Sequence, residues 1–305
     1  MFPLTLLPDN RTLTVAADET ILAATLRQGV PHVHACGGLA QCSTCRVQVL
    51  DGLAHCSPRT PAEQALADRL RLPADLRLAC QITTTGPLCL RRPVLDTLDV
   101  ALIQQALEHP DQQEGTEQQV AVLFSDIEDY TAFADEVPPY DVIHVLNRYF
   151  EVMGEVIRPY HGHISDYIGD GLMVVFGLKH PETAVADALA AGHAMMRHVA
   201  PLNAYLQQMY GRTFRVRIGL HYGPAVVGHI GGRDFRKLAT IGDTVNVAAR
   251  IESANKEFGT YFLVSQAVVD AAGPGLVVRQ GFMSALKGKK GSYRLYEVAV
   301  PAQEE

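Results

Sequence analysis

No stretch of the sequence is apolar for the length that a membrane span requires, and basic residues are not in excess. The formal net charge is -7 and the sequence pI is about 5.9, which argues against nucleic acid or an anionic membrane as the main partner. The first residues also lack the basic region and the small-residue cleavage site of a secretory signal. We therefore expect a cytoplasmic protein.

Cysteine is absent from the last two thirds of the chain. All six cysteines lie in the first third, which in a reducing compartment indicates metal or redox chemistry rather than structural disulfides. The rest of the composition is ordinary for a soluble globular protein, with 48% hydrophobic and 19% charged residues. A length of 305 residues favours two domains.

Three of the cysteines share one Gly-rich loop. Cys36, Cys42 and Cys45 follow the spacing Cys-x5-Cys-x2-Cys, and the glycines between them allow the backbone to wrap closely around a single centre. A fourth ligand must come from another segment. Cys80, within Arg-Leu-Ala-Cys-Gln, is the natural candidate.

This loop and the Arg-Leu-Ala-Cys-Gln segment resemble the adrenodoxin/putidaredoxin branch of the [2Fe–2S] ferredoxins, which differs from plant-type spacing by one inserted residue. The resemblance implies a β-grasp ferredoxin domain at residues 1–92, with the cluster bound by Cys36, Cys42, Cys45 and Cys80. A zinc site is the disfavoured alternative, because zinc sites usually pair two Cys-x-x-Cys knuckles and only one is present. Cys56 and Cys89 fall outside the pattern and are interpreted as small buried hydrophobes.

No flavin or nicotinamide motif accompanies the cysteine motif, so this domain is not expected to oxidise a substrate by itself. A cluster held by four thiolates exchanges one electron. That electron must come from an electron-donor protein or a small redox agent, or the cluster must act as a sensor.

A connector at residues 93–119 follows the first domain. Leu95, Leu98 and Leu102 are spaced three and four apart, which predicts a helix over 96–108 that packs either on its own chain or in a coiled coil. The polar residues 111–119 predict a flexible hinge.

The second domain, at residues 120–305, alternates strands and helices. The pattern predicts a strand at 120–125, a helix at 142–157, two strands around Gly169-Asp170, a helix near 182–208, and strands at 214–221 and 225–228. This order is compatible with a βαββαβ sheet covered by helices on one face, so the whole chain is expected to be α+β.

Two carboxylates follow strands in this domain. Asp126 comes directly after an apolar run, and Asp170 lies in a Gly-flanked turn ahead of another. A rigid strand can aim such a side chain at a ligand, and paired carboxylates suit hard divalent cations.

Five segments, in order, resemble the signatures of the class III nucleotide cyclases. They are Phe-Ser-Asp-Ile, Tyr-Ile-Gly-Asp-Gly-Leu-Met-Val-Val-Phe, Arg-Ile-Gly-Leu-His-Tyr-Gly, Gly-Asp-Thr-Val-Asn-Val-Ala-Ala-Arg and Leu-Lys-Gly-Lys. The resemblance implies that Asp126, Asp170 and the backbone carbonyl of Ile127 bind two Mg²⁺ or Mn²⁺ ions. These ions activate the ribose 3′-hydroxyl and neutralise the departing pyrophosphate.

The same resemblance assigns further roles. Asn246, which orients the ribose, and Arg250, which stabilises charge on the α-phosphate, lie four apart on one helix face. Lys287 and Lys289 match the triphosphate-binding segment. Glu128 and Asp129 receive no role and are interpreted as solvated turn carboxylates.

In this family the metal aspartates come from one cyclase domain and the Asn/Arg pair from its partner. The chain has one cyclase domain that holds both sets, so the resemblance implies a homodimer with active sites across the shared interface. No nucleic acid or membrane partner is expected.

In this family, two positions recognise the purine base of the nucleotide. Adenylyl members usually carry a lysine where this chain has Asp166, and an Asp or Thr where it has Ala239; guanylyl members carry a Glu and a small residue. A carboxylate only accepts hydrogen bonds unless it is protonated, which leans toward guanine, whereas soluble members of this kind more often use ATP. ATP is the expected substrate, with GTP as the alternative.

The leading hypothesis is a redox-responsive cyclase that converts ATP to 3′,5′-cyclic AMP and pyrophosphate. The rival is an electron-transfer ferredoxin whose cyclase-like domain only dimerises. Retention of both metal aspartates, the asparagine and the arginine argues against the rival.

Overall fold

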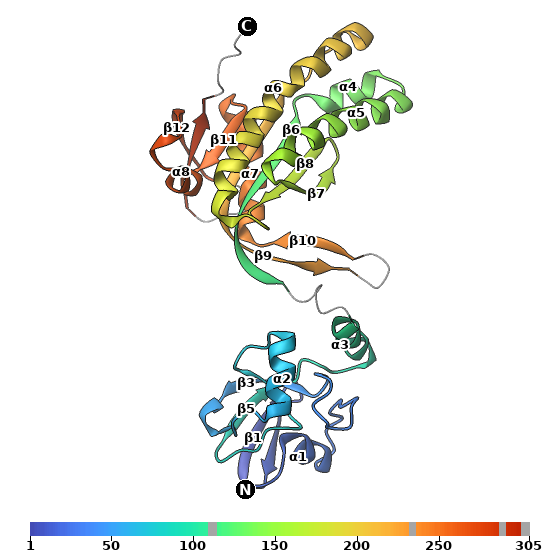
Figure 1. Cartoon of the computed structure of the whole chain (residues 1–305), viewed down its shortest axis with the longest axis vertical. Coiled ribbons are helices and arrows are strands. Elements are labelled where there is room, and N and C mark those ends of the chain that lie inside the picture. Colours follow the sequence, from blue (N-terminus) through green and yellow to red (C-terminus); the bar gives the residue numbers. More distant parts are fainter. Residues whose placement is uncertain (109–114, 232–235, 287–290, 300–305) are drawn as a thin grey trace. The chain divides into compact units, whose positions relative to one another are not determined.

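The computed structural model describes residues 1–108, 115–231, 236–286 and 291–299. These residues form two compact units, Met1–Glu114 and Gly115–Glu305, each with its own hydrophobic core (Figure 1). In the described part of the chain, no helix has the length and apolarity needed to cross a membrane.

The first unit is a five-stranded mixed sheet in the order β2-β1-β5-β3-β4. β1 pairs parallel to β5, and the other pairs are antiparallel. With helix α1 packed on the shared core, this is the predicted β-grasp arrangement. The elements are β1 (Phe2–Leu7), β2 (Arg11–Val15), α1 (Ile21–Arg27), β3 (Arg46–Asp51), α2 (Pro61–Leu70), β4 (Leu76–Leu78) and β5 (Leu88–Arg91).

The predicted connector helix is present as α3 (Thr97–Glu108), and the three spaced leucines do not pack on their own chain, which was one of the two alternatives. Leu95, Leu98 and Leu102 are exposed, whereas Ile103 is buried and Leu107 packs against the core of the first unit. The expected apolar face is therefore not the one that contacts the chain.

The predicted hinge is shorter than 111–119. Strand β6 (Thr116–Ile127) already begins at Thr116 and pairs with β9 there, so residues 116–119 are sheet rather than a flexible segment. Residues 109–114 lie outside the described residues. The polar side chains at 116–119 occupy a half-exposed strand end, a place that polarity alone does not distinguish from a loop.

The second unit is built on an eight-stranded sheet in the order β12-β13-β11-β9-β6-β8-β7, with β10 paired to β9. β6 and β9 are the central strands (Figure 1). The strands besides β6 are β7 (His163–Ile168), β8 (Gly171–Phe176), β9 (Val216–Ile230), β10 (Lys237–Ile241), β11 (Phe262–Ser265), β12 (Val278–Ser284) and β13 (Tyr293–Val298); the helices are α4 (Tyr130–Glu136), α5 (Pro139–Ile157), α6 (Ala184–Tyr210), α7 (Asp243–Phe258) and α8 (Gln266–Ala272).

The two strands predicted at 214–221 and 225–228 are one continuous strand, β9. Gly223-Pro224 indicated a break, but Pro224 lies opposite Gln119 and the pairing with β6 continues to Val227. β10, which the sequence analysis did not predict, then returns along β9 as a hairpin (Figure 1).

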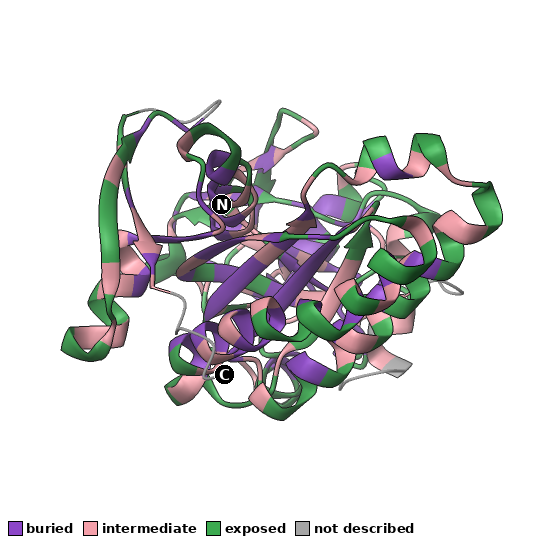
Figure 2. Ribbon diagram, turned by 90° about the horizontal axis from the view of Figure 1, so that it is seen from above, coloured by how far each residue is buried: buried purple, intermediate pink, exposed green. Residues whose placement is uncertain are grey.

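Helices cover both faces of the sheet, so the prediction of one covered face is wrong. Alternate residues of β6 face opposite ways, with Leu123 in the core beneath α5, α6 and α8, and Val122 in the core beneath α7. All of residues 120–123 are buried, and most of the central strand surface is buried in Figure 2. A continuous apolar run of this kind is typical of a strand with both faces covered.

Candidate active site

The end of β6 and the β7–β8 turn bring Asp126 and Asp170 together. The backbone N–H of Ile127 donates to Asp170 Oδ2 at 3.2 Å, which holds the second carboxylate beside the first strand. A Cβ added at Gly171 would lie 2.8 Å from the Ser125 carbonyl oxygen, so the turn can approach β6 this closely only because position 171 is glycine.

The proximity of the two carboxylates disfavours the ionised form of Asp126. Burial, followed by the Asp170 carboxylate and the Glu252 charge, raises the pKa of Asp126 to about 7, and Arg217 opposes this shift. Two carboxylates that share a site resist simultaneous ionisation, so this pair is electrostatically prepared for a cation.

A cavity of about 560 Å³ opens beside these carboxylates. Its wall comes from the β6–α4 segment, the β7–β8 turn, β9 and α7, and Ile127 is part of it. It carries five carboxylates against two cations, a balance that suits oxygen-loving metal ions. The charged lining residues are Asp126, Asp129, Asp135, Asp170 and Glu252, together with Arg217 and Lys256.

Four of these charges were not predicted from the sequence: Asp135, Arg217, Glu252 and Lys256. Glu252 and Lys256 are one helical turn apart on α7, a spacing that the sequence does show. What the spacing does not show is that this face of α7 borders the end of β6.

Glu128 is not the solvated carboxylate that was expected. Its side chain is only 16% exposed and accepts from Arg215 at 2.7 Å, from Arg217 at 2.6 Å and from the Tyr261 hydroxyl at 3.3 Å. Glu128 therefore anchors the guanidinium of Arg217 at the rim of the carboxylate cavity. Asp129, in contrast, is exposed and in the left-handed region, with φ 55°.

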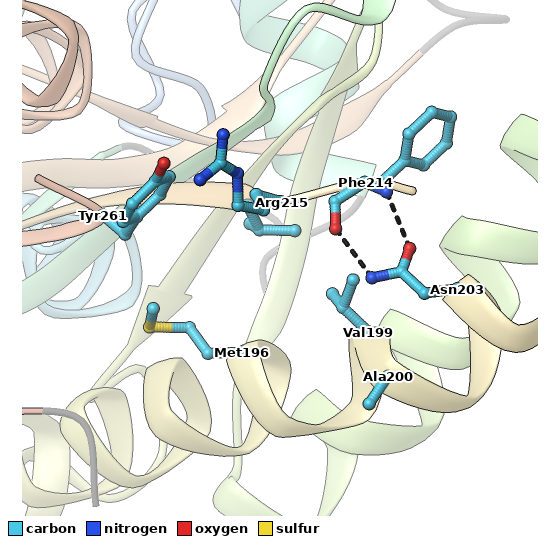
Figure 3. Close-up of a pocket in the computed structure, with 8 residues that line it drawn as sticks. Met196, Val199, Ala200, Asn203, Phe214, Arg215 and Tyr261 are labelled. Carbon is cyan, nitrogen blue, oxygen red and sulfur yellow. Dashed lines mark hydrogen bonds between the residues drawn. The ribbon is translucent and has the colours of Figure 1, made fainter. Parts of the chain in front are cut away.

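A second, smaller cavity of about 230 Å³ lies between α6 and the start of β9 (Figure 3). The Asn203 side chain accepts from Phe214 N–H at 2.7 Å and donates to the Phe214 carbonyl at 2.9 Å. The Arg215 guanidinium, whose carbon lies 5.0 Å from the centre of the Tyr261 ring, occupies the same wall. The two hydrogen bonds of Asn203 tie α6 to the segment that leads through Arg215 to Arg217 on β9.

Asn246 and Arg250 lie on α7, four residues apart, but neither lines the carboxylate cavity of its own chain. Asn246 is exposed, and its side-chain amide donates weakly to the Gly242 carbonyl at 3.4 Å. Nη1 of Arg250 is buried without a hydrogen-bond partner in the described structure. Buried guanidinium N–H groups are usually hydrogen-bonded, so this one is an exception.

Asp166 and Ala239 are the two positions expected to contact the base, and they lie on β7 and β10, two strands that contact each other. Asp166 on β7 forms an ion pair with Lys237 on β10, with 2.5 Å between Oδ1 and Nζ, and Lys237 is two residues from Ala239 on the same strand. Lys237 was not singled out in the sequence. Lys287 and Lys289, predicted to contact triphosphate, lie outside the described residues.

The four predicted cluster cysteines form two contacting pairs. Cys45 Sγ donates to Cys80 Sγ at 3.4 Å, which lowers the pKa of Cys80 to about 6. Cys36 lies against Cys42, and although burial opposes it, hydrogen bonds from the Cys42 thiol and from backbone N–H groups lower the pKa of Cys36. Two thiolates for each of two irons is the donor set of a [2Fe–2S] cluster, so these residues fit the group.

Neighbouring groups support this arrangement. The Thr44 hydroxyl lies 3.1 Å from Cys42 Sγ, and the Gln81 side-chain amide donates to Cys80 Sγ at 3.5 Å. Glu63 is buried and accepts from Arg77 Nε at 2.9 Å and from Leu78 N at 2.8 Å, which fixes the strand that leads to Cys80. Within the described segments, no three His, Cys, Asp or Glu side chains are grouped so as to hold a single metal ion.

Comparison with known proteins agrees with both halves of this description. Residues 112–295 match the family described as "Adenylate and Guanylate cyclase catalytic domain", and residues 4–85 match "2Fe-2S iron-sulfur cluster binding domain".

Two curated relatives are adenylate cyclases by name. Adenylate cyclase 1 of Rhizobium meliloti (strain 1021) is 32% identical over 182 residues, which is 59% of this chain and 27% of the relative. The adenylate cyclase of Anabaena cylindrica is 30% identical over 205 residues, 64% of this chain and 39% of the relative. The chain thus spans well under half the length of either relative.

Two solved structures share the fold of the second unit. The guanylyl cyclase Cya2 has a TM-score of 0.58 and 28% identity, covering 63% of this chain and 98% of Cya2. The adenylyl cyclase CyaB from P. aeruginosa has a TM-score of 0.57 and 26% identity, covering 61% of this chain and 96% of CyaB.

Proposed function

The chain belongs to the adenylate and guanylate cyclase catalytic domain family, with a 2Fe-2S iron–sulfur cluster binding domain ahead of it, and from that premise we propose that it is a redox-regulated class III nucleotide cyclase. The reaction is conversion of ATP to 3′,5′-cyclic AMP and pyrophosphate. The observation that carries the proposal is the pair Asp126 and Asp170, held together at the rim of an open cavity despite their repulsion.

The residues of the carboxylate cavity fit two Mg²⁺ or Mn²⁺ ions, held by Asp126, Asp170 and the carbonyl of Ile127. Bound there, the ions supply Lewis-acid stabilisation of the attacking 3′-oxygen and of the leaving pyrophosphate. Arg217, fixed by Glu128, and Lys256 keep positive charge at the same rim, where phosphate oxygens carry negative charge.

The second half of the site is Asn246 and Arg250 from a second copy of the chain. Asn246 hydrogen-bonds the ribose and limits the rotation of its 3′-hydroxyl, and Arg250 donates to the α-phosphate as charge develops there. The support for this role is the exposure of Asn246 on α7 and the absence of both residues from the lining of the carboxylate cavity. A homodimer with two such composite sites follows. Lys287 and Lys289 remain the residues expected to contact the triphosphate.

The [2Fe–2S] cluster, bound by Cys36, Cys42, Cys45 and Cys80, supplies a one-electron change of charge in the first unit. An electron-donor protein or a small redox agent provides that electron, and cyclase output changes with it. The relatives include proteins named for either nucleotide, so ATP is the substrate proposed and GTP the alternative.

Cyclic-nucleotide formation by the full chain tests the proposal. Oxidised and dithionite-reduced protein are compared anaerobically with ATP and with GTP in the presence of Mn²⁺, and absorbance confirms the cluster. We expect cyclic AMP at rates that differ between the two redox states, and no product from Asp170→Asn. No product in either state would refute the cyclase, equal rates would refute redox control, and a faster GTP reaction would change the substrate.

A further inference from the structure

The ion pair between Asp166 and Lys237 joins a position that concerns the base to a lysine that has so far received no role. Asp166 lies where β7 shifts its register against β8, between Ile164 and Asp166, and such a bulge re-aims the side chains that follow it. The two side chains keep 38% and 52% of their exposed area, so the pair is accessible to a ligand.

The surroundings of the pair suit a flat ligand. Lys237 and Ala239 are two apart on β10 and so share a face of that strand. Gly228, which has no side chain, lies opposite Ala239 on β9, and Ile168, two residues beyond Asp166, is exposed. A charged donor and a charged acceptor therefore border a surface of small residues with an apolar side chain nearby.

We propose that Lys237 is a specificity-determining residue for the base: its ammonium donates to N1 of adenine while Asp166 accepts from the 6-amino group. This inference rests on the proposed function and names the nucleotide that the site takes. The chain then presents a lysine donor from β10 and a carboxylate acceptor from β7 to the base.

The ion pair favours adenine over guanine. The edge of adenine presents one acceptor, N1, beside one donor, the 6-amino group. Guanine presents two adjacent N–H donors, which a carboxylate meets best with both of its oxygens. Because Asp166 Oδ1 is engaged by Lys237, one oxygen remains free, which is what adenine requires.

Equilibrium binding of 3′-deoxy-ATP to the full chain with Mn²⁺ tests this assignment, because that analogue lacks the attacking hydroxyl and cannot cyclise. We expect Lys237→Met to weaken binding about 10- to 100-fold, as for loss of a hydrogen bond from a charged group. Lys179→Met, at an exposed lysine of the same unit, is the matched control and should leave binding within about twofold.

A second analogue, 3′-deoxy-ATP with a C–H group in place of N1, separates base contact from a purely structural role. The wild type should lose about the same factor on this analogue that Lys237→Met loses on the first, and the variant should lose nothing further. If Lys237 only braces the β9–β10 hairpin, the two losses add, which overturns the proposal. Equal binding of both analogues by the wild type overturns it as well.

These binding measurements are independent of turnover. A wild type that shows the expected losses but forms no cyclic AMP upholds the assignment of Lys237 and refutes the proposed reaction. A wild type that forms cyclic AMP while Lys237→Met retains full affinity does the reverse.

Discussion

At the residue scale, the ionised Asp126 carboxylate destabilises the fold, because it is partly buried beside Asp170. Its folded-state pKa of about 7 lies above the value of 3.8 for an ordinary aspartate. The unfolded chain therefore releases this proton at a lower pH than the folded chain does. The resulting destabilisation is absent near pH 4, grows as pH rises and is complete above about pH 7.

Asp126→Asn removes that cost. In metal-free protein at pH 8 we expect the variant to be more stable than the wild type by about 1 kcal/mol, a modest value because the side chain is partly exposed. The difference should vanish near pH 4. Urea unfolding at the two pH values measures it, and Mn²⁺ should stabilise the wild type but not the variant. A variant that is less stable at pH 8 would contradict the electrostatic account.

A substitution at Thr44 tests, at the residue scale, whether the cluster is bound by the four predicted cysteines. Its hydroxyl, which lies 3.1 Å from Cys42 Sγ, stabilises the more negative, reduced state of a cluster bound there. Thr44→Val should lower the reduction potential by about 40 mV, the equivalent of one hydrogen bond in a one-electron couple. A redox titration followed by electron paramagnetic resonance measures the shift. Thr44→Ser keeps the hydroxyl and should stay near the wild-type value; an unchanged potential in Thr44→Val would refute the contact.

At the element scale, the approach of α7 to β9 sets the position of the cavity wall. A Cβ at Gly219 would lie 2.0 Å from the backbone nitrogen of Glu252, so any side chain there must push the helix away. Asn255, one turn further along, donates to the Ile218 carbonyl at 2.9 Å and ties the two elements together. The helix therefore depends on a single glycine for its distance from the sheet.

Gly219→Ala should lower the free energy of unfolding by about 3 kcal/mol, because overpacking against backbone cannot be relieved by a rotamer change. Gly154→Ala is the matched control: in the last turn of α5 the new Cβ would meet only Ile164 Cδ1 at 3.9 Å. That substitution should stabilise by about 0.5–1 kcal/mol through helix propensity. Guanidinium unfolding of both variants gives the comparison, and a neutral Gly219→Ala would disprove the close contact.

At the scale of the whole molecule, the two sets of residues proposed to form the active site do not line one cavity of the chain. Asp126 and Asp170 line the carboxylate cavity, whereas Asn246 and Arg250 lie on α7 outside its lining. A symmetric dimer pairs each half-site with its complement twice. Two different defects can therefore compensate each other in a mixed dimer.

Asp126→Asn and Arg250→Ala should each be inactive alone and regain activity when subunits exchange. Random exchange makes half of the dimers mixed, and one of the two sites in each is intact, so about a quarter of wild-type activity is expected. Mixing Asp126→Asn with Asp170→Asn is the control, because both defects lie in the same half-site and no intact site forms. Recovery in that control, or none in the first mixture, would exclude composite sites.

The features that the sequence predicts each lie within a short contiguous segment. The spacing of Cys36, Cys42 and Cys45, the strand that ends at Asp126 and the glycines around Asp170 each lie within about ten residues. Local backbone preference and hydrophobic periodicity are enough to place such groups at a loop or a strand end. The two-domain α+β architecture follows from the same signals.

Only the tertiary structure decided which distant charges meet. Lys237 and Asp166 are 71 residues apart, Arg217 and Glu128 are 89 apart, and Tyr261 and Glu128 are 133 apart. Periodicity shows that a strand is apolar on both faces but not that α7 covers the second one, or that β10 returns beside β9. Partners at such separations are set by sheet order and helix packing, which depend on the whole chain, so no local pattern records them.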